Sequence, residues 1–218
     1  MDANYQVNEL AKEESWRLFR IMGEFVEGFD ALSRVLPAVT VYGSSRSKPG
    51  SWSYETAFTL GDALARKGFS VITGGGPGVM EAANKGALAA GGRSVGLNID
   101  IPQEASSFCT TLSLKFHYFF VRKVMLVKYA TAFILFPGGF GTLDELFELS
   151  TLMQTKKLEP YPIVLMGSQY WAGLLDWLQE EAIGRDRLDP KSLDVFTVTD
   201  DIAEVSTLIE QCGPRIHG

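Results

Sequence analysis

The chain has 218 residues, of which 46% are hydrophobic and 21% are charged, and its formal net charge is −6. This composition is typical of a folded domain with a substantial apolar core, and no apolar run approaches the length that spans a bilayer. The negative charge argues against non-specific nucleic-acid binding, which needs a basic face. It leaves room for a small anionic ligand held by local N–H groups and arginines.

The N-terminal residues and the cysteines indicate the compartment of the protein, and the histidines indicate whether it binds a metal. Residues 1–6 do not resemble a signal peptide, and Cys109 and Cys212 are far apart and have no CxxC partner. We therefore expect a cytoplasmic protein with reduced thiols. Because His117 and His217 are the only histidines, a histidine-based metal site is not expected, and we predict neither a metal nor a cofactor.

Helices and short apolar strands alternate along the chain. Residues 8–33 are predicted to form one long helix, because apolar side chains from Leu10 to Leu32 recur at helical spacing. Strands are predicted at 38–42, 69–73, 94–97, 131–136, 162–166 and 196–198. Helices are predicted at 53–67, 79–90, 119–130, 142–156 and 169–182, with a last helix that opens at Asp201. Residues 98–113 are polar and irregular, and we expect them to form a mobile flap.

This alternation specifies an α/β fold in which a doubly wound, Rossmann-like parallel sheet is flanked by helices. We expect residues 1–218 to form a single domain of this kind, with residues 1–36 as an extra N-terminal helical extension. In such sheets ligands bind outside the carboxyl ends of the strands.

Three glycine-bearing turns follow predicted strands, at 43–46, 74–78 and 137–141, and should meet at that edge. A glycine-rich turn between a strand and a helix presents bare N–H groups and the positive end of the helix dipole, which together bind phosphate. The turn at 137–141 leads into Thr142 and Glu145. A phosphate cradle beside a carboxylate suggests chemistry on a phosphorylated ligand.

The helix at 119–130 adds positive charge to the same edge. Twelve helical residues cover about 18 Å and six strand residues about 20 Å, so the start of this helix should return to the turn at 137–141. Arg122 and Lys123 lie in its first turn. Cations there oppose the helix dipole at a cost of a few tenths to about 1 kcal/mol, which suggests an anionic partner. The partner is Glu145, a ligand phosphate, or both in turn.

Each of these features also has a purely structural interpretation. The turn at 74–78 can be a simple tight turn, Thr142 and Glu145 fit a capping box, and Arg122 and Lys123 can be solvated surface charges. The convergence of all of them on one edge favours a site. The Walker A motif and the G-x-G-x-x-G fingerprint are missing from the sequence, and its one G-x-S-x-G match, Gly92–Gly96, is not an elbow because its serine starts a predicted strand instead of following one. A P-loop NTPase, a dinucleotide-binding enzyme and an α/β-hydrolase are therefore disfavoured.

The segments Gly74–Glu81 and Pro137–Glu145 resemble the paired motifs of the LONELY GUY (LOG) family of cytokinin riboside 5′-monophosphate phosphoribohydrolases, long labelled lysine decarboxylase-like. The similarity runs from about residue 38 to about residue 182. It implies a Rossmann-like homodimer or larger assembly that cleaves a nucleoside 5′-monophosphate to free base and ribose 5-phosphate. Many members have Met-His where this chain has Phe119-Phe120. The missing histidine favours AMP or another nucleotide over a prenylated one.

The family pattern implies a role for each candidate residue. Arg122 and Glu145 match the catalytic pair. The residues expected to bind substrate or phosphate are Gly138, Gly139, Gly141, Thr142, Gly75, Gly76, Gly78, Ser44, Arg46 and Lys123. We expect Glu145 to stabilise positive charge at C1′ and to activate water, while Arg122 clamps ligand oxygens and holds Glu145 ionised. Two alternatives stand beside this one. The first is a non-catalytic nucleotide or molybdenum-cofactor carrier. The second, disfavoured, is an amino-acid decarboxylase, for which no lysine shows the local pattern of a pyridoxal phosphate site.

Overall fold

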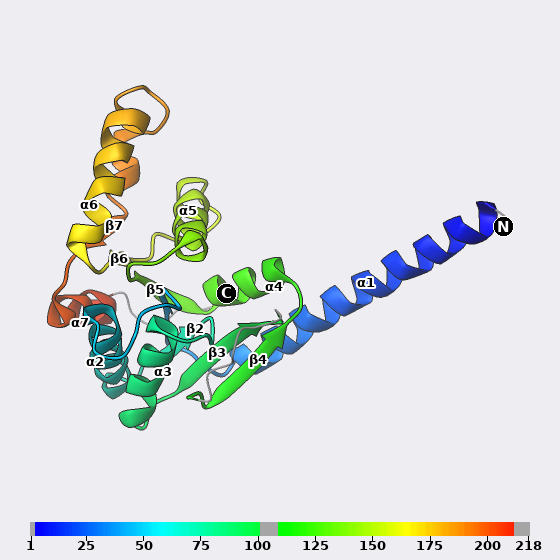
Figure 1. Ribbon diagram of the computed structural model, residues 1–218, viewed down its shortest axis with the longest axis horizontal. Coiled ribbons are helices and arrows are strands. Elements are labelled where there is room, and N and C mark those ends of the chain that lie inside the picture. Colours follow the sequence, from blue (N-terminus) through cyan, green and yellow to red (C-terminus); the bar gives the residue numbers. More distant parts are fainter. Residues whose placement is uncertain (1–2, 101–108, 212–218) are drawn as a thin grey trace.

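The computed structural model describes the backbone of residues 3–100 and 109–211. Seven parallel strands form one sheet in the order β4-β3-β2-β1-β5-β6-β7 (Figure 1). The strands are β1 (Ala38–Tyr42), β2 (Ser70–Thr73), β3 (Ser94–Ile99), β4 (Leu112–Phe116), β5 (Ala130–Leu135), β6 (Ile163–Leu165) and β7 (Phe196–Val198). The strand order runs outward from β1 to β4 on one side and from β5 to β7 on the other. The predicted Rossmann-like, doubly wound architecture is therefore confirmed.

Helices cover both faces of the sheet. They are α1 (Ala3–Leu32), α2 (Trp52–Arg66), α3 (Val79–Ala89), α4 (Phe119–Lys128), α5 (Phe140–Gln154), α6 (Ser168–Trp177) and α7 (Ile202–Gln211), with a π-helical segment at Leu178–Ile183 and a 3₁₀ turn at Pro190–Leu193. Two separate apolar clusters form the core. One joins the sheet to α2, α3 and α7, and the other joins it to α4, α5, α6 and the end of α1.

Alternation along β1 decides which side chains face the site. Val39 and Val41 pack into the cluster beneath α2 and α3, whereas Ala38 and Tyr42 belong to the opposite cluster. Successive side chains of a strand point to opposite faces, so this division follows from the pleat. Tyr42, at the carboxyl end of β1, therefore lies on the face that α4 and α5 cover.

Strand β4 is the element that the sequence prediction missed. Its residues, Leu112-Ser113-Leu114-Lys115-Phe116, alternate apolar and polar, and only Leu114 and Phe116 are buried. That alternation is the ordinary pattern of a half-buried edge strand and could have been recognised. The predicted flap at 98–113 is wrong at both ends, because residues 98–99 belong to β3 and residues 112–113 belong to β4. Residues 101–108 lie outside the described residues.

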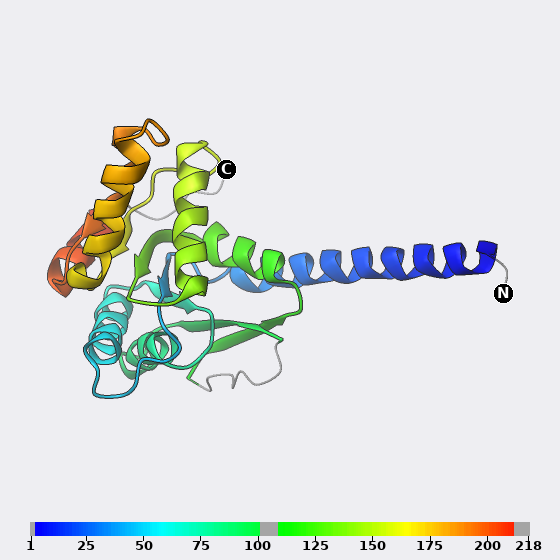
Figure 2. The same ribbon diagram turned by 45° about the horizontal axis from the view of Figure 1, so that its top comes forward.

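Helix α1 extends away from the rest of the molecule in both views (Figures 1 and 2). The predicted helix is confirmed, and it begins at Ala3 rather than at residue 8. Among its described side chains, those that pack on the core lie toward the C-terminal end, as Ile21, Phe25 and Leu32 do. Trp16, Phe19 and Val26 are more than 60% exposed. Within the described ranges, no helix carries a stretch long and apolar enough to cross a membrane.

Candidate active site

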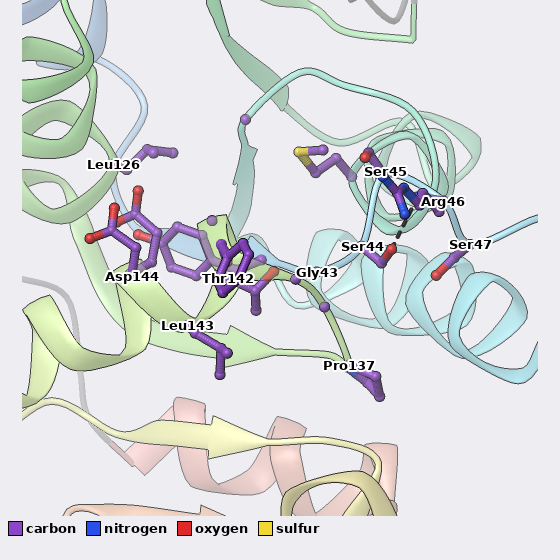
Figure 3. A pocket seen from close by; sticks show the side chains of 18 of the residues that line it. Gly43, Ser44, Ser45, Arg46, Ser47, Leu126, Pro137, Thr142, Leu143 and Asp144 are labelled. Atoms are coloured by element: carbon purple, nitrogen blue, oxygen red, sulfur yellow. Dashed lines mark hydrogen bonds between the residues drawn. The ribbon is translucent and has the colours of Figure 1, made fainter. Parts of the chain in front are cut away.

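A cavity of about 900 Å³ opens at the carboxyl ends of β1 and β5, where the strand order reverses. This is the position at which doubly wound sheets bind ligands, and its volume suits a nucleotide-sized ligand. Figure 3 shows the turn at 44–47 on one side and residues 142–144 on the other. The predicted site residues that line the cavity are Ser44, Arg46, Arg122, Gly138, Gly139, Gly141, Thr142 and Glu145.

Backbone hydrogen bonds tie the three glycine-bearing turns together. Ser44 N donates to Pro137 O at 3.1 Å, and Val79 N donates to Ser44 O at 3.1 Å. Gly78 has a φ of 73°, and a Cβ there would lie 2.3 Å from Ser44 O. Only glycine lets these two turns approach so closely.

The second glycine turn contributes less to the cavity than predicted. Of its residues only Gly74 lines the cavity, whereas Gly75, Gly76 and Gly78 do not. A Cβ on Gly75 would lie 2.4 Å from Asn98 Oδ1, so this glycine faces β3. Gly75 and Gly78 pack closely against Asn98 and the turn after β1, and the phosphate-binding role of the three glycines stays a prediction.

The turn after β5 leads into α5, whose N-cap is Gly139. The first N–H groups of a helix have no intrahelical acceptor, and those of Phe140 and Gly141 open on the cavity that both residues line. Tyr170, on α6, also lines the cavity, and its hydroxyl donates to Gly138 O at 2.6 Å. This bond holds the loop in place, and no local pattern in the sequence indicated it.

We predict that Gly138→Ala destabilises the protein by about 1–3 kcal/mol. A Cβ at this position would lie 2.1 Å from Thr142 Oγ1 and 2.6 Å from Thr142 Cβ, so the first turn of α5 would have to shift. Gly141→Ala is the matched control, because a Cβ there meets nothing within 4 Å and alanine favours the helix. Urea unfolding followed by tryptophan fluorescence measures both. Equal stability of the two variants would contradict the close packing of this loop.

The capping-box interpretation of Thr142 and Glu145 is wrong. Helix α5 begins two residues earlier than predicted, its N-cap is Gly139, and Thr142 N donates to Gly139 O at 3.0 Å. Thr142 is therefore already inside the helix, and Glu145 lies beyond the first turn. Glu145 Oε2 is buried and has no hydrogen-bond partner among the described residues. The carboxyl group is thus not used to cap the helix.

Glu145 is buried at 5% exposure, although it lines the cavity. Burial, followed by the nearby carboxylate of Glu148, raises the pKa of its carboxyl group to about 7. Lys123 and Arg122 lower this pKa but do not outweigh burial. Arg122 thus lowers the pKa of Glu145, as predicted, but by less than burial raises it. An acid that titrates near neutrality inside a cavity is a candidate for proton transfer.

Arg122 is the fourth residue of α4 and reaches the same cavity as Glu145. Its Cζ lies 5.5 Å from the centre of the Phe119 ring, and its Nε is buried without a hydrogen-bond partner among the described residues. A Cβ on Gly74 would lie 3.4 Å from Arg122 Nη1, which places the guanidinium against the second glycine turn. Arg122 thus has donor capacity left for a ligand.

Lys123 does not line the cavity. Its Nζ lies 2.9 Å from Asp144 Oδ2 and 3.0 Å from Glu148 Oε2, so the side chain ties α4 to α5. Successive residues of a helix point in directions about 100° apart, and Arg122 and Lys123 therefore reach different surroundings. The anionic partners of Lys123 are therefore Asp144 and Glu148 rather than the predicted Glu145, and its role in binding substrate stays a prediction.

These features define a class. The protein is a Rossmann-like α/β protein whose ligand cavity lies at the topological switch point, with a glycine-rich helix start and a buried acid in its wall. Likeness to solved structures supports the class. An X-ray structure of a structural-genomics target is 26% identical with a TM-score of 0.60, covering 80% of this chain and 98% of that one. A molybdenum cofactor binding protein from Rippkaea orientalis is 21% identical with a TM-score of 0.61, covering 80% and 96%.

Sequence comparison identifies the family. The model of the family described as possible lysine decarboxylase matches residues 80–209. A cytokinin riboside 5′-monophosphate phosphoribohydrolase of Rhodococcoides fascians is 29% identical over 168 residues, which cover 69% of this chain and 84% of the relative. The chain belongs to this family, the LOG family.

Proposed function

We propose that this chain hydrolyses the N-glycosidic bond of a nucleoside 5′-monophosphate, AMP or a cytokinin riboside monophosphate, to free base and ribose 5-phosphate. The observation that carries the proposal is that the Glu145 carboxyl group, the Arg122 side chain and the N-terminus of α5 line one cavity. The similarity to the R. fascians cytokinin riboside 5′-monophosphate phosphoribohydrolase supports the same reaction.

The proposed step places water, activated by Glu145, at C1′ of the ribose. The Glu145 carboxylate takes a proton from the water as the C1′–O bond forms. The C1′–N bond breaks, its electron pair stays on the base, and the base takes a proton from solvent. A carboxylate beside C1′ also stabilises the positive charge that develops on the sugar. A guanidinium group has five N–H donors and no acceptor, so Arg122 binds ligand oxygens rather than transferring a proton.

In this proposal the N–H groups at the start of α5, together with Thr142, bind the phosphate. A phosphate held there positions the ribose without taking part in the reaction, so its binding energy contributes to the rate through orientation. Ser44 and Arg46 line the opposite wall and are placed to reach the phosphate or the ribose hydroxyls.

Replacing Arg122 with alanine should weaken substrate binding and turnover together, lowering kcat/KM about a hundredfold. Arg122→Lys is the matched comparison, since it keeps the charge but loses the two-pronged donor geometry and should recover only part of the activity. Steady-state kinetics with AMP measures both variants. Unchanged kinetics in Arg122→Ala would remove this residue from the proposed site.

The aromatic lining favours a purine nucleotide. Phe119 lines the cavity and is 53% exposed, whereas Phe120 does not line the cavity. Phe140, at 93% exposure, also lines it. Such rings offer stacking surfaces for a planar purine. A screen of nucleoside monophosphates for ribose 5-phosphate release tests the function, and its absence with every nucleotide would overturn the proposal.

A carrier function is the second candidate, because molybdenum cofactor binding proteins share the fold. Their identity to this chain, 22% and 21%, concerns the fold alone. A carrier has no need of a buried acid whose pKa is raised to about 7. Stoichiometric AMP binding without adenine release would favour the carrier.

Oligomeric state and compartment complete the proposal. A homodimer or a larger assembly of this chain would cover the exposed apolar side chains of α1, such as Trp16 and Phe19, and light scattering that shows a monomer would refute it. Cytoplasmic localisation stays a prediction from the sequence.

A further inference from the structure

Tyr42 carries a buried polar group that the proposed step does not use. Its side chain, at the carboxyl end of β1, is 6% exposed and lines the cavity. The hydroxyl oxygen is buried and has no hydrogen-bond partner among residues 3–100 and 109–211. Buried hydroxyls are nearly always hydrogen-bonded, so an unpaired one in a cavity wall requires an explanation.

Two more unpaired polar atoms lie in the same wall. Glu145 Oε2 and Arg122 Nε are also buried without partners among the described residues. Tyr42 packs in the core cluster that contains residues of α4 and α5, the helices that carry these two side chains. A phenol donor and a carboxylate acceptor, both unpaired, thus face one cavity.

The charge state of Tyr42 suits a donor. Burial raises the pKa of the hydroxyl well above its ordinary value, the carboxylates of Glu145 and Glu148 raise it further, and Arg122 lowers it by less. The phenol therefore stays neutral to a higher pH than an exposed tyrosine does and keeps its proton for donation. The same electrostatic coupling shows that Tyr42 lies within the field of Glu145.

Tyr129 shows what a structural buried tyrosine looks like in this chain. It is 5% exposed, close to the value for Tyr42, and its hydroxyl donates to Phe29 O at 3.2 Å. Tyr129 does not line the cavity. The difference between the two residues is that the Tyr42 hydroxyl is unpaired and borders the candidate site.

We propose that Tyr42 is a positioning residue for the reaction, whose hydroxyl donates a hydrogen bond to the Glu145 carboxylate when ligand fills the cavity. The inference rests on the proposed function. The bond orients the carboxylate toward the water and favours its ionised form. It acts through Glu145 and involves no contact between Tyr42 and the substrate.

Replacing Tyr42 with phenylalanine should shift the pH dependence of turnover. The groups around Glu145 are Asp144 and Glu148 on α5, Arg122 and Lys123 on α4, and Tyr42 on β1. Loss of a donor to the carboxylate raises the pKa of Glu145, so the acid limb of the profile should move up by about one pH unit. Activity with AMP should fall about tenfold at pH 6 and less than about twofold at pH 9.

Stability separates a positioning role from a structural one. Tyr42→Phe removes an unpaired buried hydroxyl, so its urea midpoint should equal or exceed that of the parent protein. Tyr129→Phe, the matched control, removes a paired hydroxyl and should lower the midpoint while leaving the pH profile unchanged. A lower midpoint for Tyr42→Phe together with an unshifted profile would overturn the inference.

A readout that does not need activity keeps the inference separate from the proposed function. NMR of carboxyl-labelled glutamate, with the Glu145 signal assigned through Glu145→Gln, gives the pKa of Glu145 with ribose 5-phosphate bound. A higher pKa in Tyr42→Phe supports the hydrogen bond, and an equal pKa overturns it. If Glu145→Gln is inactive and Tyr42→Phe keeps the parent profile, only the inference fails. If Glu145→Gln is fully active, the proposed role of Glu145 fails, and if the parent protein releases ribose 5-phosphate from no nucleotide, the proposed function fails.

Discussion

Glu145→Gln should bind AMP nearly as well as the parent protein and release adenine about a thousandfold more slowly. The amide keeps the size and polarity of the carboxyl group but cannot take a proton from water or carry the negative charge that faces C1′. Phosphate binding at the start of α5 does not depend on the carboxylate. Adenine release under single-turnover conditions, with AMP affinity measured by calorimetry, separates binding from chemistry.

Glu180→Gln is the matched control for this variant. Glu180 is exposed on the π-helical segment and does not line the cavity, so its substitution should leave both binding and release unchanged. Full activity in Glu145→Gln would refute the proposed mechanism. A loss of AMP binding equal to the loss of rate would show that Glu145 holds substrate and does no chemistry.

The same substitution should stabilise the protein at alkaline pH by about 3 kcal/mol. Burial raises the pKa of Glu145 from its ordinary value of 4.5 to about 7, so the folded protein holds this proton more tightly than the unfolded chain does. Unfolding releases the proton between these two values, and the free energy of unfolding of the parent protein falls as pH rises through that window. Each unit of pKa shift corresponds to about 1.4 kcal/mol. Glutamine does not ionise, so the variant does not lose stability as the pH rises through this window.

Urea unfolding at pH 4 and pH 8 tests this prediction. The gain from Glu145→Gln should be present in full at pH 8 and absent at pH 4, where the carboxyl group is protonated in both states. Glu180→Gln should show no gain at either pH, because its side chain is exposed. A gain that does not change with pH would mean that the substitution acts through packing rather than through the charge of Glu145.

If Glu145→Gln is both less active and more stable than the parent protein, the Glu145 carboxylate contributes to activity and destabilises the fold. A buried carboxylate without a hydrogen-bond partner is unfavourable for folding, and such conflicts are expected where function requires them. An inactive variant that is more stable than the parent protein would show directly that activity and stability conflict at this residue.

Local pattern alone was sufficient for the fold class and for most of the cavity wall. Short apolar runs separated by glycine turns and amphipathic helices leave a parallel, doubly wound sheet as the solution, because each helix must bury one face. Since the carboxyl ends of parallel strands share one edge, the turn after β1 and the turn after β5 had to meet. Arg122 and Glu145 followed from the same reasoning and line the cavity. That residues 1–218 form one domain stays a prediction.

The direction of each side chain, and which distant residues lie close together, could be decided only from the tertiary structure. Lys123 turns to Asp144 although it follows Arg122 directly, because one helical step changes the direction of a side chain. Glu145 could be distinguished from a capping residue only once α5 was seen to begin at Phe140. The place of Tyr42 beside Glu145 depends on the order of β1 and β5 in the sheet and on the packing of two helices over them. Tyr42 and Glu145 are about a hundred positions apart in the chain, and no local pattern in the sequence shows that both line one cavity.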